Sequence, residues 1–396
     1  MYTNKKIKVA FFSDILKEDF DGASRTIYQI VNRIPADKFE FLFICGISPE
    51  TDFPFDIVEI TTLTIPFNSN YKIAIPFFEK KKLNKKLVEF NPDVIHITSP
   101  SLLGKYALNY GQFHNIPIIT IYHTHFISYI DYYLENISFI IEPVKNLMIK
   151  TIKQFYEKCN LVYVPTKIMK KELVGLNISD SNMKIWPRGL NTSSFNPAKK
   201  NTEFIRKFTG NKKPNILFTS RLVWEKNLKI LIKIYKKAEQ ENLPFNFIIA
   251  GDGIADASLR EQMPNAFFLG KLNHEDLSVV YASCDIFLFT SVTETYGNVV
   301  VEAMASGLPC VIANGGGSAG FIENGVNGFL CDPHQPEDYI KNINTILQNE
   351  SLRTTFIQKG LSYASSLDWE SLTNLYFDDL TLLATKVKVV REEELV

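Results

Sequence analysis

The chain has 396 residues, of which 45% are hydrophobic and 22% charged, and its 43 Lys and Arg equal its 43 Asp and Glu in number. At about 150 residues per domain, this length predicts two or three domains with a sizeable core. The composition excludes a disordered chain, and the lack of net positive charge argues against a dedicated nucleic-acid-binding protein.

Short apolar runs alternate with longer segments of helical period, which is typical of parallel sheets wrapped by helices. In the first half this pattern predicts strands near 7–12, 39–45, 93–97, 117–122, 161–164 and 184–186. It predicts helices there near 23–33, 77–90, 102–114, 140–158 and 166–174. In the second half it predicts strands near 215–219, 245–250, 266–269, 285–289, 309–312 and 328–330. The helices expected there lie near 227–241, 275–282, 298–306, 336–348 and 351–361.

The two series meet at 191–201, a segment of small polar residues in which Pro197 blocks regular structure. We therefore place an N-terminal, acceptor-binding domain at 1–195 and a C-terminal, donor-binding domain at 196–366. The remaining segment, 367–396, begins with an amphipathic stretch that we expect to form a helix packing back on the first domain.

The sequence also bears on where the protein acts. Its five cysteines form no CxxC pair and indicate free thiols, its N-terminus leads directly into a strand, and no apolar window is long enough to cross a bilayer. We therefore expect a cytoplasmic protein, with a place at the inner face of the cell membrane left open. Two basic runs, 79–86 and 145–158, are either solvated helix faces or contacts to anionic lipid.

The densest signal for a site is the string from Ser291 to Pro309, which follows an apolar strand and continues into a helix. Ligands of open α/β sheets bind beyond the carboxyl ends of the strands, so this loop stands where a ligand would bind. A helix that begins near Asn298 presents free N–H groups suited to phosphate, and Gly297 permits close approach of the backbone. Glu302 can bind vicinal hydroxyls. The alternative is that Glu294 caps the helix and Glu302 is an exposed helix residue.

Two further strand ends carry polar residues in the second half. Arg221 and Lys226 follow the strand at 215–219, and a planar guanidinium with a point-charge ammonium suits a diphosphate. Surface ion pairing is the alternative. The turn Gly251-Asp-Gly253 follows the next strand but is not the GxGxxG pattern of a dinucleotide site.

The first half carries weaker signals. Gly22 lies between the first strand and the first helix, where a backbone can reach phosphate. The run Tyr-His-Thr-His-Phe at 122–126 also follows a strand. Two histidines separated by one residue could hold a metal, but no His or Cys besides His123 and His125 is near in sequence, so we favour a hydrogen bond from His123 to a polar substrate.

Together these strings resemble glycosyltransferase family 4, a retaining, nucleotide-sugar-dependent group with the GT-B fold. They are Asp-Gly-Ala-Ser-Arg, Tyr-His-Thr-His-Phe, Arg-Gly-Leu-Asn-Thr-Ser-Ser-Phe-Asn-Pro, Ser-Arg-Leu-Val-Trp-Glu-Lys-Asn, Gly-Asp-Gly and Glu294-x7-Glu302 with Glu-Ala-Met-Ala-Ser-Gly-Leu-Pro. The resemblance extends from residue 7 to about residue 370. It implies two Rossmann-like domains that face each other across a cleft.

The resemblance also assigns roles by position. Arg221 and Lys226 would neutralise the donor diphosphate, Glu302 would bind the ribose, and Glu294 would hold the transferred sugar. The remaining donor contacts would come from Gly22, Gly270, Leu272, Tyr296, Gly297 and Asn298. His123 would lie by the sugar and the reacting centre, and His123 and Tyr129 would meet the acceptor. The catalytic set would be His123, Glu294, Arg221 and Lys226.

The expected reaction moves a sugar from a UDP- or GDP-linked donor to an acceptor hydroxyl, with retention and without metal or other cofactor. The run at 122–129 resembles family members that glycosylate membrane lipids, so we expect a lipid or lipid-linked acceptor and peripheral membrane contact. A soluble or polysaccharide acceptor is the first alternative. A sugar-nucleotide epimerase and a non-catalytic scaffold are the others.

Overall fold

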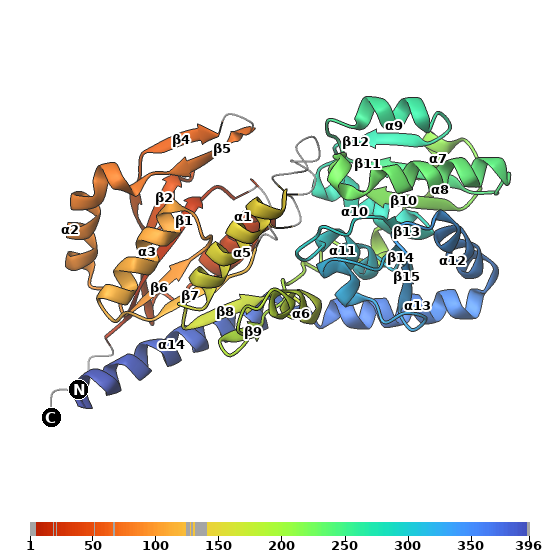
Figure 1. Ribbon diagram of the computed structural model, residues 1–396. Helices are drawn as coiled ribbons and strands as arrows, with labels where there is room; N and C mark the ends of the chain where they lie inside the picture. The colour runs from red at the N-terminus through yellow and green to blue at the C-terminus, as the bar shows by residue number, and fades with distance from the viewer. Residues whose placement is uncertain are drawn as a thin grey trace. The chain divides into compact units, whose positions relative to one another are not determined.

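The computed structural model describes residues 5–18, 20, 22–50, 52–65, 68–123, 127, 130 and 141–393. Contacts group the chain into two compact units (Figure 1). Unit 1 holds the residues up to Pro187 together with those from Glu370 onward, and unit 2 holds Arg188–Trp369.

Unit 1 is built on a parallel sheet whose described strands have the order β3-β2-β1-β6-β7-β8-β9. These strands are β1 (Ile7–Ile15), β2 (Phe39–Ile47), β3 (Asp56–Glu59), β6 (Val94–Ile97), β7 (Ile118–Ile121), β8 (Leu161–Val164) and β9 (Met183–Ile185). A separate antiparallel hairpin consists of β4 (Thr62–Ile65) and β5 (Asn68–Ala74). The helices are α1 (Gly22–Val31), η1 (Pro76–Glu79), α2 (Lys80–Phe90), α3 (Leu102–Phe113), α5 (Ile141–Tyr156), α6 (Lys167–Gly175) and α14 (Trp369–Glu393).

Unit 2 repeats this plan with a parallel sheet of order β12-β11-β10-β13-β14-β15. Its strands are β10 (Asn215–Thr219), β11 (Asn246–Ala250), β12 (Phe267–Gly270), β13 (Ile286–Phe289), β14 (Cys310–Ala313) and β15 (Gly328–Cys331). Its longer helices are α7 (Thr202–Thr209), α8 (Leu228–Gln240), α10 (His274–Ser283), α11 (Asn298–Ala305), α12 (Pro336–Gln348) and α13 (Glu350–Ser365). Shorter helical segments are η3 (Pro197–Lys199), η4 (Trp224–Lys226), α9 (Asp256–Gln262) and η5 (Gly317–Phe321).

Both sheets are built from strands that are continuous apolar runs. In β1 and in β13 the central side chains are buried without alternation, because helices cover both faces of a parallel sheet. Each unit has its own buried apolar cluster, one built around the strands of each sheet. The predicted α/β class with two Rossmann-like domains is confirmed.

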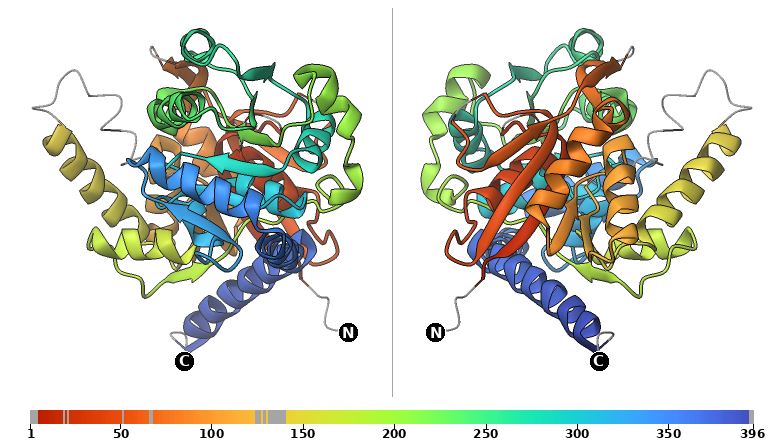
Figure 2. Two further views of the ribbon diagram at one scale, coloured as in Figure 1. Left: turned by 90° about the vertical axis from the view of Figure 1, so that its right-hand side faces the viewer. Right: turned by 90° about the vertical axis from the view of Figure 1, so that its left-hand side faces the viewer.

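The C-terminal helix α14 is a single long helix that packs within unit 1 (Figures 1 and 2). The hydroxyl of buried Tyr376 and Nδ1 of His96 in β6 share a hydrogen bond of 2.8 Å. Further along the helix, Asp379 accepts from the ammonium of Lys184 in β9 at 2.7 Å. Polar contacts to two strands therefore fix the position of α14 on unit 1.

Every predicted strand and helix is present, within a few residues of its expected bounds. The structure adds elements that the sequence pattern did not predict, namely β3, β4, β5, α7 and α9. These are short, and β4 and β5 pair outside the main sheet, so they lack the long apolar runs of central strands.

Candidate functional site

The segments that follow three strands of unit 2, β10, β12 and β13, hold the residues expected at the donor site. Because β10, β11, β12 and β13 are parallel, their carboxyl ends lie at one edge of the sheet. Arg221 follows β10, Gly270 ends β12, and Glu294 follows β13. The fold thus brings residues separated by more than 70 positions to one edge, where open α/β sheets bind ligands.

The centre of this edge is an ion pair between Lys226 and Glu294. The ammonium nitrogen of Lys226 lies 2.6 Å from Oε1 of Glu294, and Ser291 donates its hydroxyl to the same oxygen at 3.3 Å. The Lys226 side chain is only 4% exposed, whereas that of Glu294 is 21% exposed. A ligand at this edge can therefore reach the carboxylate more easily than the ammonium.

The charges around Glu294 determine its ionisation. Burial raises the pKa of this carboxyl, but the ion pair with Lys226, the nearby Arg221 and the bond from Ser291 together lower it below its ordinary value. Glu294 is therefore an anion at neutral pH, and the pair with Lys226 is a true ion pair.

Arg221 belongs to a second ion pair at the same edge. Its Nη2 lies 3.2 Å from Oε1 of Glu225, whose side chain is 4% exposed, while the Arg221 side chain is 66% exposed. Glu225 thus holds one side of an exposed guanidinium, an anchoring role that the sequence analysis did not assign. The spacing of four residues was its only signal in the sequence.

Two threonines join the turn that carries these charges to the loop after β13. Thr290 donates its hydroxyl to the carbonyl of Lys226 at 3.0 Å, and Thr293 donates to the carbonyl of Glu225 at 3.2 Å. The two loops are therefore one bonded assembly, in which each of two cations lies against a carboxylate.

Glycines allow the loop after β13 to pack tightly against the segment that follows β14. Gly297 has a φ of +88°, and a Cβ there would lie 2.7 Å from Cβ of Ser318. The N–H of Gly317 donates to the carbonyl of Glu294 at 2.6 Å, and a Cβ on Gly317 would lie 2.0 Å from the carbonyl oxygen of Thr295. Both positions require glycine. The sequence analysis did not assign a role to Gly317.

The helix after this loop, α11, begins at Asn298 directly after Gly297. Its residue Glu302 is 8% exposed and accepts a hydrogen bond of 3.3 Å from the hydroxyl of buried Tyr281. Glu302 is therefore not an exposed helix residue. Tyr296 is 1% exposed and donates its hydroxyl to the carbonyl of Arg188 at 2.7 Å, so its side chain anchors the loop.

The turn with Gly270 and Leu272, two of the predicted donor contacts, lies at the same edge. Gly270 has a φ of +69°, and a Cβ added there would meet open space. Leu272 packs partly buried against the core of unit 2. The left-handed backbone conformation therefore favours glycine at position 270, whereas space for a side chain does not limit the choice there.

In unit 1 the structure describes two of the predicted residues, each in the segment that follows a strand. Gly22 is the first residue of α1, and His123 lies two residues after β7 and is 9% exposed. Burial and the neighbouring His123 lower the pKa of His96 well below its ordinary value. Tyr129, predicted to meet the acceptor, lies outside the described residues.

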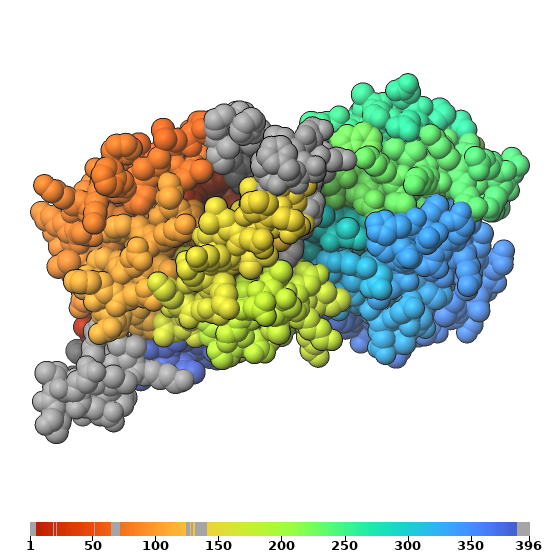
Figure 3. All heavy atoms as spheres, viewed as in Figure 1, coloured from red at the N-terminus to blue at the C-terminus, as the bar shows by residue number. Residues whose placement is uncertain are grey.

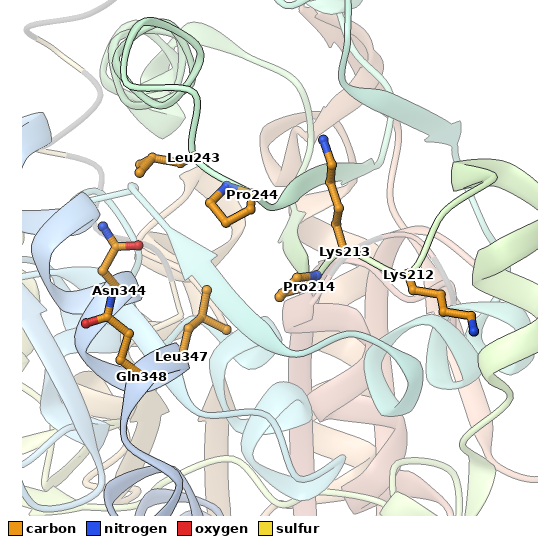
Figure 4. A pocket seen from close by; sticks show the side chains of 8 residues that line it. All are labelled: Lys212, Lys213, Pro214, Leu243, Pro244, Asn344, Leu347 and Gln348. Carbon is orange, nitrogen blue, oxygen red and sulfur yellow. The ribbon is translucent and has the colours of Figure 1, made fainter.

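A separate hollow of about 620 Å³ lies at the opposite edge of the unit 2 sheet (Figure 4). Two prolines help to line it at the amino ends of the strands: Pro214 comes directly before β10, and Pro244 lies two residues before β11. The ion pairs described above lie beyond the carboxyl ends, so this hollow is not the candidate donor site.

Two features are absent from the described part of the chain. Among these residues, no group of three or more His, Cys, Asp or Glu is placed to hold a metal ion. None of the described helices is both long enough and apolar enough to span a membrane.

Solved structures support the fold. A sucrose-phosphate synthase from Thermosynechococcus elongatus superposes with a TM-score of 0.75 and 17% identity, covering 96% of this chain and 100% of that chain. The Anabaena protein HepE, in a complex with UDP and glucose, superposes with a TM-score of 0.69 and 20% identity, covering 95% and 99%. At these low sequence identities, both similarities show a shared fold and no more.

Sequence comparisons give relatives over most of the chain. Sulfoquinovosyl transferase of Arabidopsis thaliana is 31% identical over 311 residues, which are 76% of this chain but only 59% of that protein. A GDP-mannose-dependent alpha-mannosyltransferase of Corynebacterium glutamicum is 27% identical over 83% of this chain and 77% of its own length. Alpha-monoglucosyldiacylglycerol synthase of Acholeplasma laidlawii is 24% identical over 94% of this chain and 97% of its own length.

Two family descriptions match adjoining segments. Residues 20–194 match "Glycosyltransferase Family 4", and residues 200–362 match "Glycosyl transferases group 1". Together the two segments take in most of both units. The chain belongs to glycosyltransferase family 4.

Proposed function

We propose that this protein is a retaining glycosyltransferase that moves a sugar from a nucleoside-diphosphate sugar to a hydroxyl of a membrane lipid or lipid-linked glycan. The observation that carries the proposal is the assembly of Arg221, Lys226 and Glu294 at the carboxyl edge of unit 2. It lies directly before Gly297 and the helix α11, whose first N–H groups suit phosphate.

The charges of this assembly fit a donor diphosphate. In the structure Lys226 is paired with Glu294, and Arg221 is held on one side by Glu225. A diphosphate that enters would compete for both cations, and it would release the Glu294 carboxylate to accept hydrogen bonds from the sugar hydroxyls. Binding of the diphosphate and binding of the sugar would thus be coupled through the ion pair between Lys226 and Glu294.

The proposed chemistry retains the anomeric configuration. The acceptor oxygen attacks the anomeric carbon on the face from which the diphosphate leaves, and the bond from that carbon to the phosphate oxygen breaks. The departing phosphate oxygen takes the acceptor proton, and the nucleoside diphosphate is released. Arg221, Lys226 and the first N–H groups of α11 would stabilise the negative charge that develops on the diphosphate. We propose that these groups act without a metal ion.

Other residues have proposed roles around this centre. Gly270, Leu272, Tyr296 and Asn298 are proposed to contribute donor contacts in unit 2. In unit 1, Gly22 is proposed to approach the phosphate, and His123 is proposed to bind the sugar or the acceptor, with Tyr129 a further predicted acceptor contact.

The relatives support a lipid acceptor and leave the donor base open. Two related proteins are named alpha-monoglucosyldiacylglycerol synthase, and one covers nearly the whole chain. The mannosyltransferases are named for GDP-mannose, whereas one neighbour in fold was solved with UDP and glucose. We therefore propose a lipid hydroxyl as the acceptor and a UDP- or GDP-linked sugar as the donor. Action at the inner face of the cell membrane is part of this proposal.

A transfer assay tests the proposal. The protein is incubated with UDP- or GDP-sugars and diacylglycerol or a glycolipid dispersed in detergent, with and without EDTA, and the product is examined by mass spectrometry and NMR. We expect an α-linked glycolipid, formed in EDTA as well. Release of nucleoside diphosphate that needs no acceptor would favour the epimerase alternative. A product with inverted configuration would contradict retention.

Glu302 gives a first quantitative prediction. We expect Glu302→Gln to weaken nucleotide-sugar binding about tenfold or more, because a carboxylate bond to ribose hydroxyls contributes about 1.5–3 kcal/mol. Isothermal titration calorimetry measures this directly. Glu323→Gln, at an exposed position of the same unit, is the matched control. Equal affinity in the variant and the parent would exclude the ribose role of Glu302.

Arg221 gives a second prediction. We expect Arg221→Ala to lower turnover at least tenfold, since the exposed guanidinium loses its charge-assisted bonds to the diphosphate. Stability should also fall, because the nearly buried carboxylate of Glu225 loses its ion-pair partner, so turnover is compared per folded protein. Initial rates are compared with those of Arg206→Ala, an exposed arginine on α7. A rate near that of the parent would remove Arg221 from the diphosphate site.

A further inference from the structure

Glu302 lies against a fully buried tyrosine. Tyr281 of α10 has no exposed surface, and its hydroxyl donates to Oε2 of Glu302 in α11 at 3.3 Å. Glu302 is itself only 8% exposed. The contact exists because α10 packs against α11, which brings together residues that are 21 positions apart. Glu302 therefore has a neighbour that is in place before any ligand binds.

The ring of Tyr281 is held by two other aromatic rings. Phe195 packs edge to face against it with centroids 5.7 Å apart, and Phe287 of β13 packs against it at an angle of 49°, also with centroids 5.7 Å apart. Phe195 belongs to the Arg-Gly-Leu-Asn-Thr-Ser-Ser-Phe-Asn-Pro string, which the proposed function otherwise leaves without a role. Because such contacts favour defined ring geometries, the hydroxyl of Tyr281 has little freedom to move away from Glu302.

The hydroxyl of Tyr281 keeps its proton. Burial raises the pKa of Tyr281 well above its ordinary value, and the carboxylate of Glu302 adds to this effect. A protonated phenol donates a hydrogen bond to a carboxylate, which has acceptor oxygens only. The bond to Oε2 therefore restrains the rotation of the Glu302 carboxylate.

We propose that Tyr281 is a positioning residue that holds the Glu302 carboxylate in the orientation that binds the ribose hydroxyls of the donor. A carboxylate that is already oriented loses less freedom when it binds two neighbouring hydroxyls than one that can rotate. Because Tyr281 is fully buried, it acts on the donor only through Glu302. This inference rests on the proposed function, in which Glu302 binds the ribose, and deepens it by naming the residue that orients Glu302.

Calorimetry with nucleoside diphosphates that have or lack the ribose hydroxyls tests this role. The parent and Tyr281→Phe are titrated with UDP and GDP and with the dideoxy forms of both, which lack the two hydroxyls. For the nucleotide that the parent binds, we expect Tyr281→Phe to weaken binding about fivefold, because one neutral hydrogen bond is lost. The affinity for the dideoxy form should be the same in both proteins.

The comparison separates positioning from a merely structural role. The phenylalanine ring still fills the space between Phe195 and Phe287, and melting temperatures show whether both proteins are folded. A side chain that only filled the core would affect the two forms of the nucleotide equally. Equal losses of affinity for the hydroxylated and the dideoxy nucleotide in Tyr281→Phe would therefore overturn the positioning role.

A double-mutant cycle shows whether Tyr281 acts through Glu302. Glu302→Ala should remove the preference of the parent for the ribose hydroxyls. Tyr281→Phe, added to Glu302→Ala, should weaken binding no further, because the acceptor of its hydrogen bond is already absent. A further fivefold loss in the double variant would mean that Tyr281 acts independently of Glu302, and it would overturn the inference.

Tyr235→Phe is the matched control, since it removes a buried hydroxyl of the same unit. The helix α8 forms part of the outer surface of unit 2 (Figure 3), and Tyr235 lies on its inner side, 3% exposed. Its hydroxyl accepts from the backbone N–H of Asn265 at 3.0 Å, before β12 and so at the opposite edge of the sheet from the candidate donor site. We expect this control to bind both forms of the nucleotide like the parent. A selective loss in the control equal to that in Tyr281→Phe would contradict a specific role for Tyr281.

Failure of the proposed function gives a different result from failure of this inference. A parent protein that binds neither nucleotide, or that binds the hydroxylated and dideoxy forms equally, would overturn the ribose role of Glu302 and this inference with it. A parent that prefers the hydroxylated form, and loses this preference in Glu302→Ala but not in Tyr281→Phe, would overturn this inference alone.

Discussion

Glu294→Gln is expected to lower sugar transfer at least a hundredfold while it leaves the affinity for free nucleoside diphosphate equal or higher. The carboxylate of Glu294 is the partner of Lys226 at 2.6 Å and is the more exposed member of the pair. If the carboxylate binds sugar hydroxyls during transfer, its loss removes two charge-assisted bonds of about 1.5–3 kcal/mol each, enough for a hundredfold effect. The diphosphate, in contrast, no longer competes with a carboxylate for Lys226.

The measurement pairs initial rates of transfer with calorimetric affinity for UDP and GDP. Glu323→Gln again serves as the control, because it neutralises an exposed carboxylate of the same unit. We propose that the donor diphosphate replaces Glu294 as the partner of Lys226. If Glu294→Gln lowered nucleotide affinity as much as it lowered the transfer rate, that proposal would be contradicted. An unchanged rate would remove Glu294 from the catalytic set.

Lys226→Met is expected to lower both nucleotide affinity and transfer, each by at least a hundredfold. The Lys226 ammonium is nearly buried and points at the carboxylate of Glu294, so its removal leaves that carboxylate without its closest counter-charge. We expect a loss of about 2–3 kcal/mol in the free energy of unfolding, below the 3–5 kcal/mol of fully buried pairs because Glu294 keeps contact with water.

This loss should depend on pH in a defined direction. Burial raises the pKa of Glu294, but Lys226, Arg221 and Ser291 together lower it below its ordinary value of 4.5. A carboxyl whose pKa is lower in the folded state contributes stability that is full above its unfolded pKa and is lost as pH falls through its folded pKa. In Lys226→Met the largest lowering influence is gone, so the pKa of Glu294 rises.

Thermal unfolding of parent and variant at about pH 7 and about pH 4 measures this difference. We expect a large difference in melting temperature at neutral pH and a smaller one in acid, where the variant can protonate Glu294. Lys229→Met, an exposed lysine at the start of α8, is the matched control. The same difference at both pH values would mean that Lys226 acts through packing and not through the charge of Glu294.

The sequence pattern predicted the fold well because parallel strands buried on both faces are continuous apolar runs. The run at 7–12 is an example, and the structure extends it to Ile15 as β1. Elements without such runs were missed. β4 and β5 form a short hairpin of mixed polar and apolar residues outside the main sheet, and α9 has only seven residues, so neither gives a long apolar run or a clear helical period.

The sequence was sufficient to predict which residues belong to the site, but not which of them contact one another. Arg221, Glu294 and Glu302 were recognisable from their position after strands and from the family resemblance. The partner of Lys226 was not, because Glu294 lies 68 residues away and is brought close only by the pairing of β10 with β13. The requirement for glycine at position 317 likewise depends on a carbonyl from another loop.

The measurement that tests the central claim most directly is a thermal-shift titration of the parent protein with UDP-, GDP- and ADP-sugars in EDTA. A ligand that binds only the folded state stabilises it by about 2.7 kcal/mol at a hundredfold excess over Kd. We predict a clear rise in melting temperature for a UDP- or a GDP-sugar, undiminished by EDTA and abolished at the same concentration by Lys226→Met. No rise with any of these donors, or a rise that requires a divalent metal, would contradict a metal-independent nucleotide-sugar site in unit 2.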